Sequence, residues 1–151
     1  MNEPLKVGDR APDFNAQDQA GETHTLEDYQ GEWLVLYFYP KDHTPGCIRE
    51  ACNIRDNFAG VKKLATILGV SGDSVKSHAS FANKYDLPFD LLADPEKKML
   101  NSYGANGEIF KKRSTFIVNP DGKIAKIYPK VSPDEHATEL IDDLKKLQSK
   151  Q

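Results

Sequence analysis

Two cysteines, Cys47 and Cys52, are the side chains of this sequence best suited to covalent chemistry, and the chain has no others. They follow an apolar run at residues 34–39, which predicts a buried strand that Pro40 ends. Pro45 suits the first position of a helix, so Cys47 falls in the first helical turn. Free backbone N–H groups and the helix dipole stabilise an anion at that end. We therefore expect Cys47 to be a nucleophilic thiolate at neutral pH.

The spacing of the two cysteines predicts a conformational change. Residues five apart on an α-helix differ by about 140° in direction, and their Cα atoms lie roughly 8 to 9 Å apart. A disulfide needs Cα atoms less than about 7 Å apart. If Cys47 and Cys52 share one helix, they can bond only where that helix unwinds. The reduced and oxidised proteins should then differ in structure.

Other interpretations of these residues stay open at this point. Thr44, three residues before Cys47, has a hydroxyl that can cap the helix or point toward the oxygen that a thiolate attacks. A cysteine in a soluble chain is also often a small buried hydrophobe. His43, Cys47 and Cys52 could hold a metal ion, but their spacing is not the short cysteine pair of structural zinc sites, and no second pair follows.

Residues 40–47 read Pro-x-x-x-Thr-x-x-Cys, and this stretch resembles the signature of the peroxiredoxins, the thiol peroxidase family of AhpC/TSA type. Cys52, five residues on, narrows the resemblance to the peroxiredoxin Q or bacterioferritin comigratory protein branch. The likeness extends to residues 7–14, 69–94 and 113–124, so it covers nearly the whole chain. A tryptophan that the family often has near residues 106–112 is missing here.

The resemblance implies a thiol-dependent peroxidase that reduces hydrogen peroxide and organic hydroperoxides, with no cofactor and no metal. Cys47 would be the peroxidatic cysteine, which becomes a sulfenic acid. Cys52 would be the resolving cysteine, which forms an intramolecular disulfide that thioredoxin or a similar dithiol reduces. Thr44 and Arg113 would hold the peroxide and activate the thiolate, and Pro40 would shield the pocket.

The roles of the remaining polar candidates are less specific. Glu50 could orient Arg113 through a charge-assisted hydrogen bond, or it could be an ordinary solvated helix glutamate. We expect His24 and His136 to be solvated, and His78 to lie on a helix face rather than to act as a base.

Two rival functions use the same cysteines. A thiol–disulfide oxidoreductase of the same fold would need a Cys-x-x-Cys pair, which this chain lacks. The second rival is a redox sensor or chaperone whose helix unwinds on oxidation to bind a partner. Both cysteines fit that rival as well, so it stays open.

Composition limits the class of protein and its partners. A chain of 151 residues has the size of one domain, 1–151, and needs no disulfide for stability. A net charge of -3 gives no basic field for nucleic acid. There is no run long enough to cross a membrane and no signal-peptide core, so we expect a cytoplasmic protein, although a chain imported into an organelle and then trimmed would look the same. The branch it resembles is often monomeric, which implies a monomer or a weak dimer.

The pattern of elements predicts an α/β, thioredoxin-like fold with a central mixed β-sheet flanked by helices. An edge hairpin is expected around Gly21, and a capping box at Ser132 and Glu135 predicts a last helix that starts at Pro133. The other expected strands are 34–39, 65–71, 87–92, 113–118 and 123–128, and the other expected helices are 46–59, 74–85 and 95–103. In open α/β sheets the ligand site lies beyond the carboxyl ends of the strands, where Cys47 falls.

Overall fold

In the computed structural model, which describes residues 4–149, the apolar run forms the central strand β3 (Leu34–Phe38). Every residue of β3 is buried, because neighbouring side chains point to opposite faces of the sheet and both faces are covered. Val35 and Tyr37 contribute to one core layer, and Leu34, Leu36 and Phe38 contribute to the other. The prediction of a fully buried strand is confirmed.

The sheet is mixed, and its strand order is β2-β1-β5-β4-β3-β6-β7. Parallel pairs join β3 to β4 and β4 to β5, and antiparallel pairs make the rest of the sheet. The strands besides β3 are β1 (Asn15–Gln17), β2 (Thr23–Thr25), β4 (Thr66–Ser71), β5 (Asp90–Ala93), β6 (Ser114–Val118) and β7 (Ile124–Tyr128).

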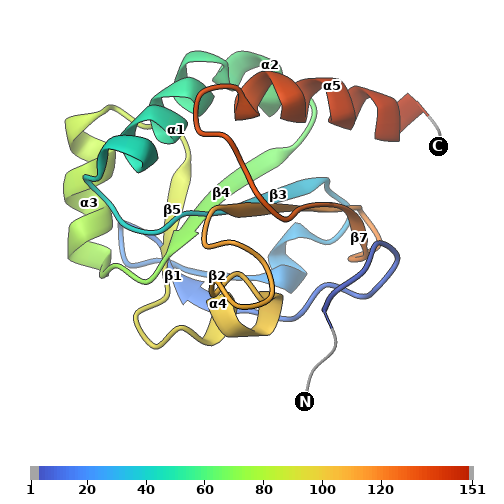
Figure 1. Ribbon diagram of the computed structural model, residues 1–151, viewed down its shortest axis with the longest axis horizontal. Helices are drawn as coiled ribbons and strands as arrows, with labels where there is room; N and C mark the ends of the chain where they lie inside the picture. Colours follow the sequence, from blue (N-terminus) through green and yellow to red (C-terminus); the bar gives the residue numbers. More distant parts are fainter. Residues whose placement is uncertain (1–3, 150–151) are drawn as a thin grey trace.

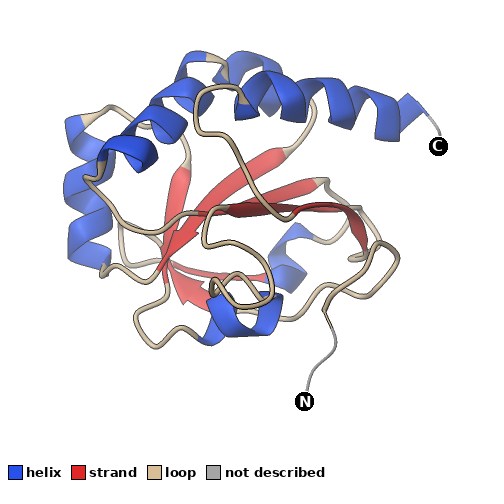
Figure 2. Cartoon of the chain, viewed as in Figure 1, coloured by secondary structure: helices blue, strands red, loops and turns tan. Residues whose placement is uncertain are grey.

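Helices cover both faces of this sheet (Figure 1, Figure 2). One core layer packs beneath α1 (Pro45–Asp56), α2 (Phe58–Lys62), α3 (Val75–Lys84) and α5 (His136–Ser149). The opposite layer packs against α4 (Lys98–Tyr103) and the 3₁₀ helix η1 (Leu26–Tyr29). No helix within residues 4–149 is long and apolar enough to span a bilayer.

The predicted helix 46–59 is wrong at its end, because the chain forms two helices that separate at Asn57. The backbone of Asn57 has φ −113° and ψ 14°, and its side-chain amide donates to the carbonyl of Asn53 at 2.8 Å. A side-chain amide that binds a nearby backbone carbonyl competes with the helical hydrogen-bond pattern. The carbonyl of Asn53 therefore has its partner in a side chain at the point where α1 ends.

The last helix begins at His136, later than the predicted start at Pro133, and Ser132 and Glu135 lie outside it. The free amide of Ala137 in its first turn donates instead to the side-chain oxygen of Asn53, at 3.0 Å. A cap supplied from α1 thus takes the place of the expected local one. An apolar stripe of α5 packs against the core: its members are Ala137, Leu140, Ile141, Leu144 and Leu147.

Gly69 on β4 is required by the packing around Tyr37. A Cβ atom there would lie 2.8 Å from the Tyr37 hydroxyl and from the Leu91 side chain. We expect Gly69→Ala to lower the free energy of unfolding by about 1–3 kcal/mol, since overpacking forces buried side chains to move. Gly72→Ala is the matched control, because its Cβ would meet only a carbonyl oxygen at 3.7 Å. Urea unfolding measures both variants, and equal losses would contradict the packing argument.

Candidate active site

Cys47 lies in the first turn of α1, as predicted. Thr44 is the N-cap residue and Pro45 the first helical residue, so the chain enters the helix through the approach loop, residues 40–44, which follows β3. The side chain of Cys47 is buried, with 1% of the residue's surface exposed. The sulfur thus lies at the amino-terminal end of a helix and at the carboxyl end of a central strand.

Arg113 brings a positive charge to this sulfur from a distant part of the chain. It directly precedes β6, which pairs antiparallel with β3 so that Ser114 lies opposite Phe38. One guanidinium nitrogen, Nη2, donates to Cys47 Sγ at 3.4 Å, and the other, Nη1, donates to Glu50 Oε1 at 2.7 Å. The pairing of these two strands therefore places Arg113 beside the first turn of α1.

Gly46 makes room for this guanidinium, and sequence reasoning missed it. A Cβ atom at Gly46 would lie 2.8 Å from Arg113 Nη2, which is closer than real Cβ contacts. Its backbone φ is not positive, so the glycine is needed for space and not for conformation. No local pattern in the sequence could have found it, because the atom it accommodates comes from another element.

Glu50 is fully buried and forms an ion pair with Arg113, so of the two alternatives left open the solvated helix glutamate is wrong. Its second oxygen, Oε2, has no hydrogen-bond partner among the described residues. Burial raises the pKa of Glu50 to about 7, although the charge and hydrogen bond of Arg113 act in the opposite direction. Burial also lowers the pKa of Arg113, but Glu50 and Cys47 outweigh it and raise that pKa overall. One guanidinium therefore serves two acidic groups in a largely buried site.

Tyr37, which the sequence did not point to, also contributes to this buried environment. The Tyr37 hydroxyl is buried without a hydrogen-bond partner among the described residues. Burial, followed by the nearby charges of Glu50 and Cys47, holds its pKa well above the usual range. The Tyr37 hydroxyl therefore stays protonated, and it adds no negative charge that would compete for Arg113.

Thr44 and Pro40 lie on the approach loop, before the cysteine. The Thr44 hydroxyl donates to the carbonyl of Lys41 at 2.7 Å and makes no capping bond, so the simple helix-cap interpretation is wrong. Pro40 is exposed where β3 ends. These contacts do not test whether the two residues help to bind a peroxide, so that role stays a prediction.

Cys52 is half-buried on the same helix as Cys47, and both thiols are free. The helix α1 is continuous from Pro45 to Asp56, so the premise of the spacing argument holds. Two residues five apart on a continuous helix are too distant for a disulfide. The helix must unwind locally before these sulfurs can bond.

Two of the histidines were predicted wrongly as solvated. His136 is buried and its Nε2 lies 2.8 Å from the Thr115 hydroxyl, and burial lowers its pKa. His24 is largely buried and its Nε2 lies 2.7 Å from Asp18. These partners belong to other elements or to a folded turn, which a one-dimensional pattern does not reveal.

The metal interpretation gains no support from the part of the chain that is described. His43 is exposed, and its ring packs edge-on against Phe81. Within residues 4–149, the groups of side chains close enough to share an ion include neither Cys47 nor Cys52.

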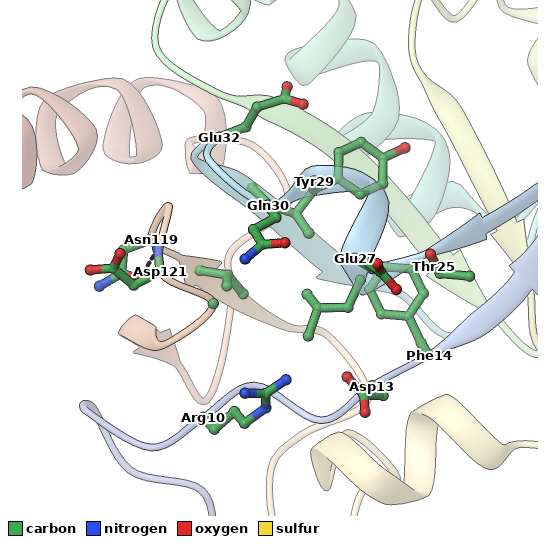
Figure 3. Close-up of a pocket in the computed structure, with 14 residues that line it drawn as sticks. Arg10, Asp13, Phe14, Thr25, Glu27, Tyr29, Gln30, Glu32, Asn119 and Asp121 are labelled. Atoms are coloured by element: carbon green, nitrogen blue, oxygen red, sulfur yellow. Dashed lines mark hydrogen bonds between the residues drawn. The ribbon is translucent and has the colours of Figure 1, made fainter.

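A cavity of about 350 Å³ lies away from the cysteines (Figure 3). Its lining includes Leu34 and Val118, which are paired at the opposite ends of β3 and β6 from Phe38 and Ser114. Arg10 and Asp13 also line it, from the segment before β1. The cavity is therefore not part of the cysteine site.

Comparison with known proteins gives a consistent result. Residues 7–127 match the AhpC/TSA family. A putative peroxiredoxin bcp of Coxiella burnetii is 41% identical over 93% of this chain and 99% of its own length, and peroxiredoxin Bcp of Bacillus subtilis is 38% identical over 97% and 99%. A chloroplastic peroxiredoxin Q of Arabidopsis thaliana is 41% identical over 93% of this chain and 68% of its own length.

Solved structures agree with these sequences. A mutant of PrxQ from Xylella fastidiosa has a TM-score of 0.87 and 31% identity, covering 96% of this chain and 98% of that one. A structure of Xanthomonas campestris bacterioferritin comigratory protein, described in terms of its alkyl peroxide reduction activity, has a TM-score of 0.84 and 32% identity, with coverages of 96% and 98%. The predicted thioredoxin-like fold is confirmed.

The titration of Glu50 should appear in the stability of the protein. Its pKa of about 7 exceeds the ordinary 4.5, so between these pH values the folded protein keeps a proton that the unfolded chain has lost. The free energy of unfolding should therefore fall as the pH rises through this range, by up to about 3 kcal/mol from this group. Glu50→Gln cannot titrate and should lack that fall.

Urea unfolding between pH 4.5 and 8 measures this difference, with the exposed Glu108→Gln as the control. The control should follow the wild type at every pH. Parallel curves for Glu50→Gln and wild type would mean that Glu50 does not titrate in this range.

Proposed function

Because the chain belongs to the AhpC/TSA family and is a peroxiredoxin of the Bcp or peroxiredoxin Q type, and hence a thiol peroxidase, we propose that Cys47 is the group that attacks the hydroperoxide. The observation that carries this assignment is the Arg113 guanidinium, 3.4 Å from Cys47 Sγ at the start of α1. A fixed cation and the free amides of a helix terminus both favour the thiolate over the thiol. Cys52 is only half-buried and has no hydrogen bond from Arg113.

In the proposed reaction the Cys47 thiolate attacks the nearer oxygen of the peroxide. The O–O bond breaks, the attacked oxygen stays on sulfur as a sulfenic acid, and the other oxygen leaves as water or an alcohol after it takes a proton. Negative charge moves from sulfur to the departing oxygen during this step. Arg113 stays charged at any working pH and carries several donors in one plane, so it can stabilise that charge on both atoms.

Thr44 and Pro40 have supporting parts in this proposal. The Thr44 hydroxyl already donates its proton to the Lys41 carbonyl, so its lone pairs are available to accept a hydrogen bond from a peroxide O–H. Pro40 has no N–H group and would shield the approach to the thiolate. Glu50 holds one edge of the Arg113 guanidinium, which leaves the other edge for the sulfur and the substrate.

We assign the second step to Cys52. Its thiolate attacks the sulfenic sulfur of Cys47, water leaves, and an intramolecular disulfide forms once α1 has unwound. A dithiol such as thioredoxin then reduces the disulfide by exchange. The proposed substrates are hydrogen peroxide and organic hydroperoxides, and the proposed setting is a cytoplasmic monomer.

Intact mass and peptide mapping after one equivalent of hydrogen peroxide test these assignments. The wild type should lose two hydrogens rapidly and yield a linked peptide that contains both cysteines. Cys52→Ser should react equally fast at first, keep one oxygen on Cys47, and then progress to the sulfinic acid with excess peroxide. Cys47→Ser should neither form the disulfide nor take up oxygen at residue 47. A persistent single oxygen in the wild type, or a disulfide between chains, would remove Cys52 from the resolving role.

The space left by Gly46 gives a second test. Gly46→Ala should displace the Arg113 guanidinium from Cys47 and lower the second-order rate with peroxide at least about tenfold, since small displacements in a site are costly. Gly60→Ala is the control, because its Cβ would meet only the flexible end of Ile141 on another helix. Stopped-flow kinetics should show a normal rate for the control. A normal rate for Gly46→Ala would mean that the guanidinium position does not matter.

A further inference from the structure

A buried polar cluster beside the Cys47 site has no part in the chemistry described so far. Asp42, in the approach loop, is 3% exposed. Its Oδ1 accepts a hydrogen bond from the Tyr39 hydroxyl at 2.7 Å, and its Oδ2 accepts one from the Ser77 hydroxyl at 2.8 Å. The same Oδ2 lies 2.7 Å from Nδ1 of His78, a histidine on α3 with no exposed surface. The carboxyl group is thus bound from three side chains.

Both ring nitrogens of His78 are engaged by neighbouring groups. Its Nε2 is 2.9 Å from the carbonyl of Leu92, which can only accept, so Nε2 carries a proton. Its Nδ1 lies 2.7 Å from Asp42 Oδ2, so both ring nitrogens have a partner. Burial raises the pKa of Asp42, but the hydrogen bonds of His78, Tyr39 and Ser77 outweigh it and hold that pKa below the usual range. Asp42 is therefore a buried carboxylate with hydrogen bonds to both of its oxygens.

The backbone of Asp42 is held as firmly as its side chain. Its amide donates to Asp73 Oδ2 at 2.8 Å, and the same oxygen accepts the Ser71 hydroxyl at 2.7 Å. His43 follows directly with φ +62°, a left-handed conformation that is uncommon for a residue other than glycine. Asp42, Asp73 and His78 are close enough to share an ion, but these hydrogen bonds already account for their positions.

A second fixed point lies downstream of Cys52. The side-chain oxygen of Asn53 accepts the Ala137 amide, and Ile54 is completely buried. Between the two fixed points, α1 is held by Arg113, which bonds Cys47 and Glu50, and by the exposed ion pair of Arg49 with Asp134, a kind that contributes little to stability. The segment with both cysteines is thus bounded by Asp42 and Asn53, which are tightly held.

We propose that Asp42, held by His78, is a positioning residue that anchors the upstream end of the reactive segment, residues 43–52, and confines the opening of the chain around both cysteines to that segment. The proposal rests on the proposed Cys47–Cys52 disulfide. An anchored end restricts the conformations of the unwound segment, so it disfavours unwinding through chain entropy. It also keeps the approach loop in place while Cys47 meets the peroxide. Loss of the anchor should therefore slow the first step and speed the second.

The chain contains a matched pair of variants for this test. Asp18 has the same 3% exposure as Asp42, lies 2.7 Å from His24, and accepts two backbone amides, but it belongs to the turn between β1 and β2. Asp42→Ala and Asp18→Ala therefore each remove a buried carboxylate that is paired with histidine. Only Asp42→Ala releases the reactive segment, so a loss of stability alone would affect both variants alike.

The first measurement follows alkylation of Cys47 by iodoacetamide in the reduced protein, with peptide mapping. Because Cys47 is buried, the reaction reports opening of α1 and needs no peroxide chemistry. We expect Asp42→Ala to speed it roughly tenfold, the factor that corresponds to a lost hydrogen bond to a charged group. Asp18→Ala should match the wild type. Equal acceleration in both variants, or none in Asp42→Ala, would overturn the proposal.

The second measurement uses stopped-flow kinetics to separate oxidation of Cys47 from disulfide formation. The ratio of the second rate to the first should rise in Asp42→Ala and stay constant in Asp18→Ala. If the wild type forms no Cys47–Cys52 disulfide, the proposed function fails, while the alkylation result still decides whether Asp42 is an anchor.

Milder variants cover the case in which Asp42→Ala does not fold. The amide of Asp42→Asn can donate to Nδ1 of a neutral His78, so this variant should recover most of the wild-type alkylation rate. Ser77→Ala removes one of the donors to Asp42 and should give a smaller acceleration in the same direction. A wild-type rate in Ser77→Ala together with an unfolded Asp42→Ala would overturn the anchor role.

Discussion

The guanidinium of Arg113 is the interaction on which this site depends, because it is shared between the sulfur that the proposed reaction needs as an anion and a carboxylate that is fully buried. Neither negative charge is favourable alone in such a place. The arrangement requires β6 to lie beside β3 with Ser114 opposite Phe38, which brings Arg113 to the end of the strand that leads to α1. It also requires Gly46, since a side chain there would occupy the space of the guanidinium. The contact between Arg113 and Cys47 thus depends on the β3–β6 register, on where α1 starts and on the lack of a side chain at Gly46.

Local rules predicted the parts of this structure that neighbouring residues determine. An uninterrupted apolar run predicted β3, and Pro45 predicted the start of α1 with Cys47 in its first turn. The expected strands 113–118 and 123–128 correspond to β6 and β7. In each case the deciding interactions lie within a few residues of one another. The association of Arg113 with Cys47 came only from a family resemblance.

Several of the errors share one physical origin, which is that a distant group provides what a local one was expected to provide. Asn53 takes the place of Ser132 as the partner of the first turn of α5, so the predicted capping box is not used. His136 on α5 is buried, and Thr115 on β6 supplies a hydrogen-bond partner for its ring. Gly46 matters because the Arg113 guanidinium, from the residue before β6, occupies the space beside it. Such pairings belong to the fold and leave no periodic signal in one sequence.

The interruption at Asn57 has a consequence for how the protein can change over evolutionary time. Helix formation is cooperative along a continuous ladder of hydrogen bonds, and that ladder stops between α1 and α2. Unwinding that begins near Cys47 therefore does not propagate along a continuous helix into α2. The free energy needed to open residues 43–52 then depends on α1 and on the contacts that hold this segment, rather than on the helix beyond Asn57. Selection can adjust turnover and thermal tolerance through different residues of the same small chain.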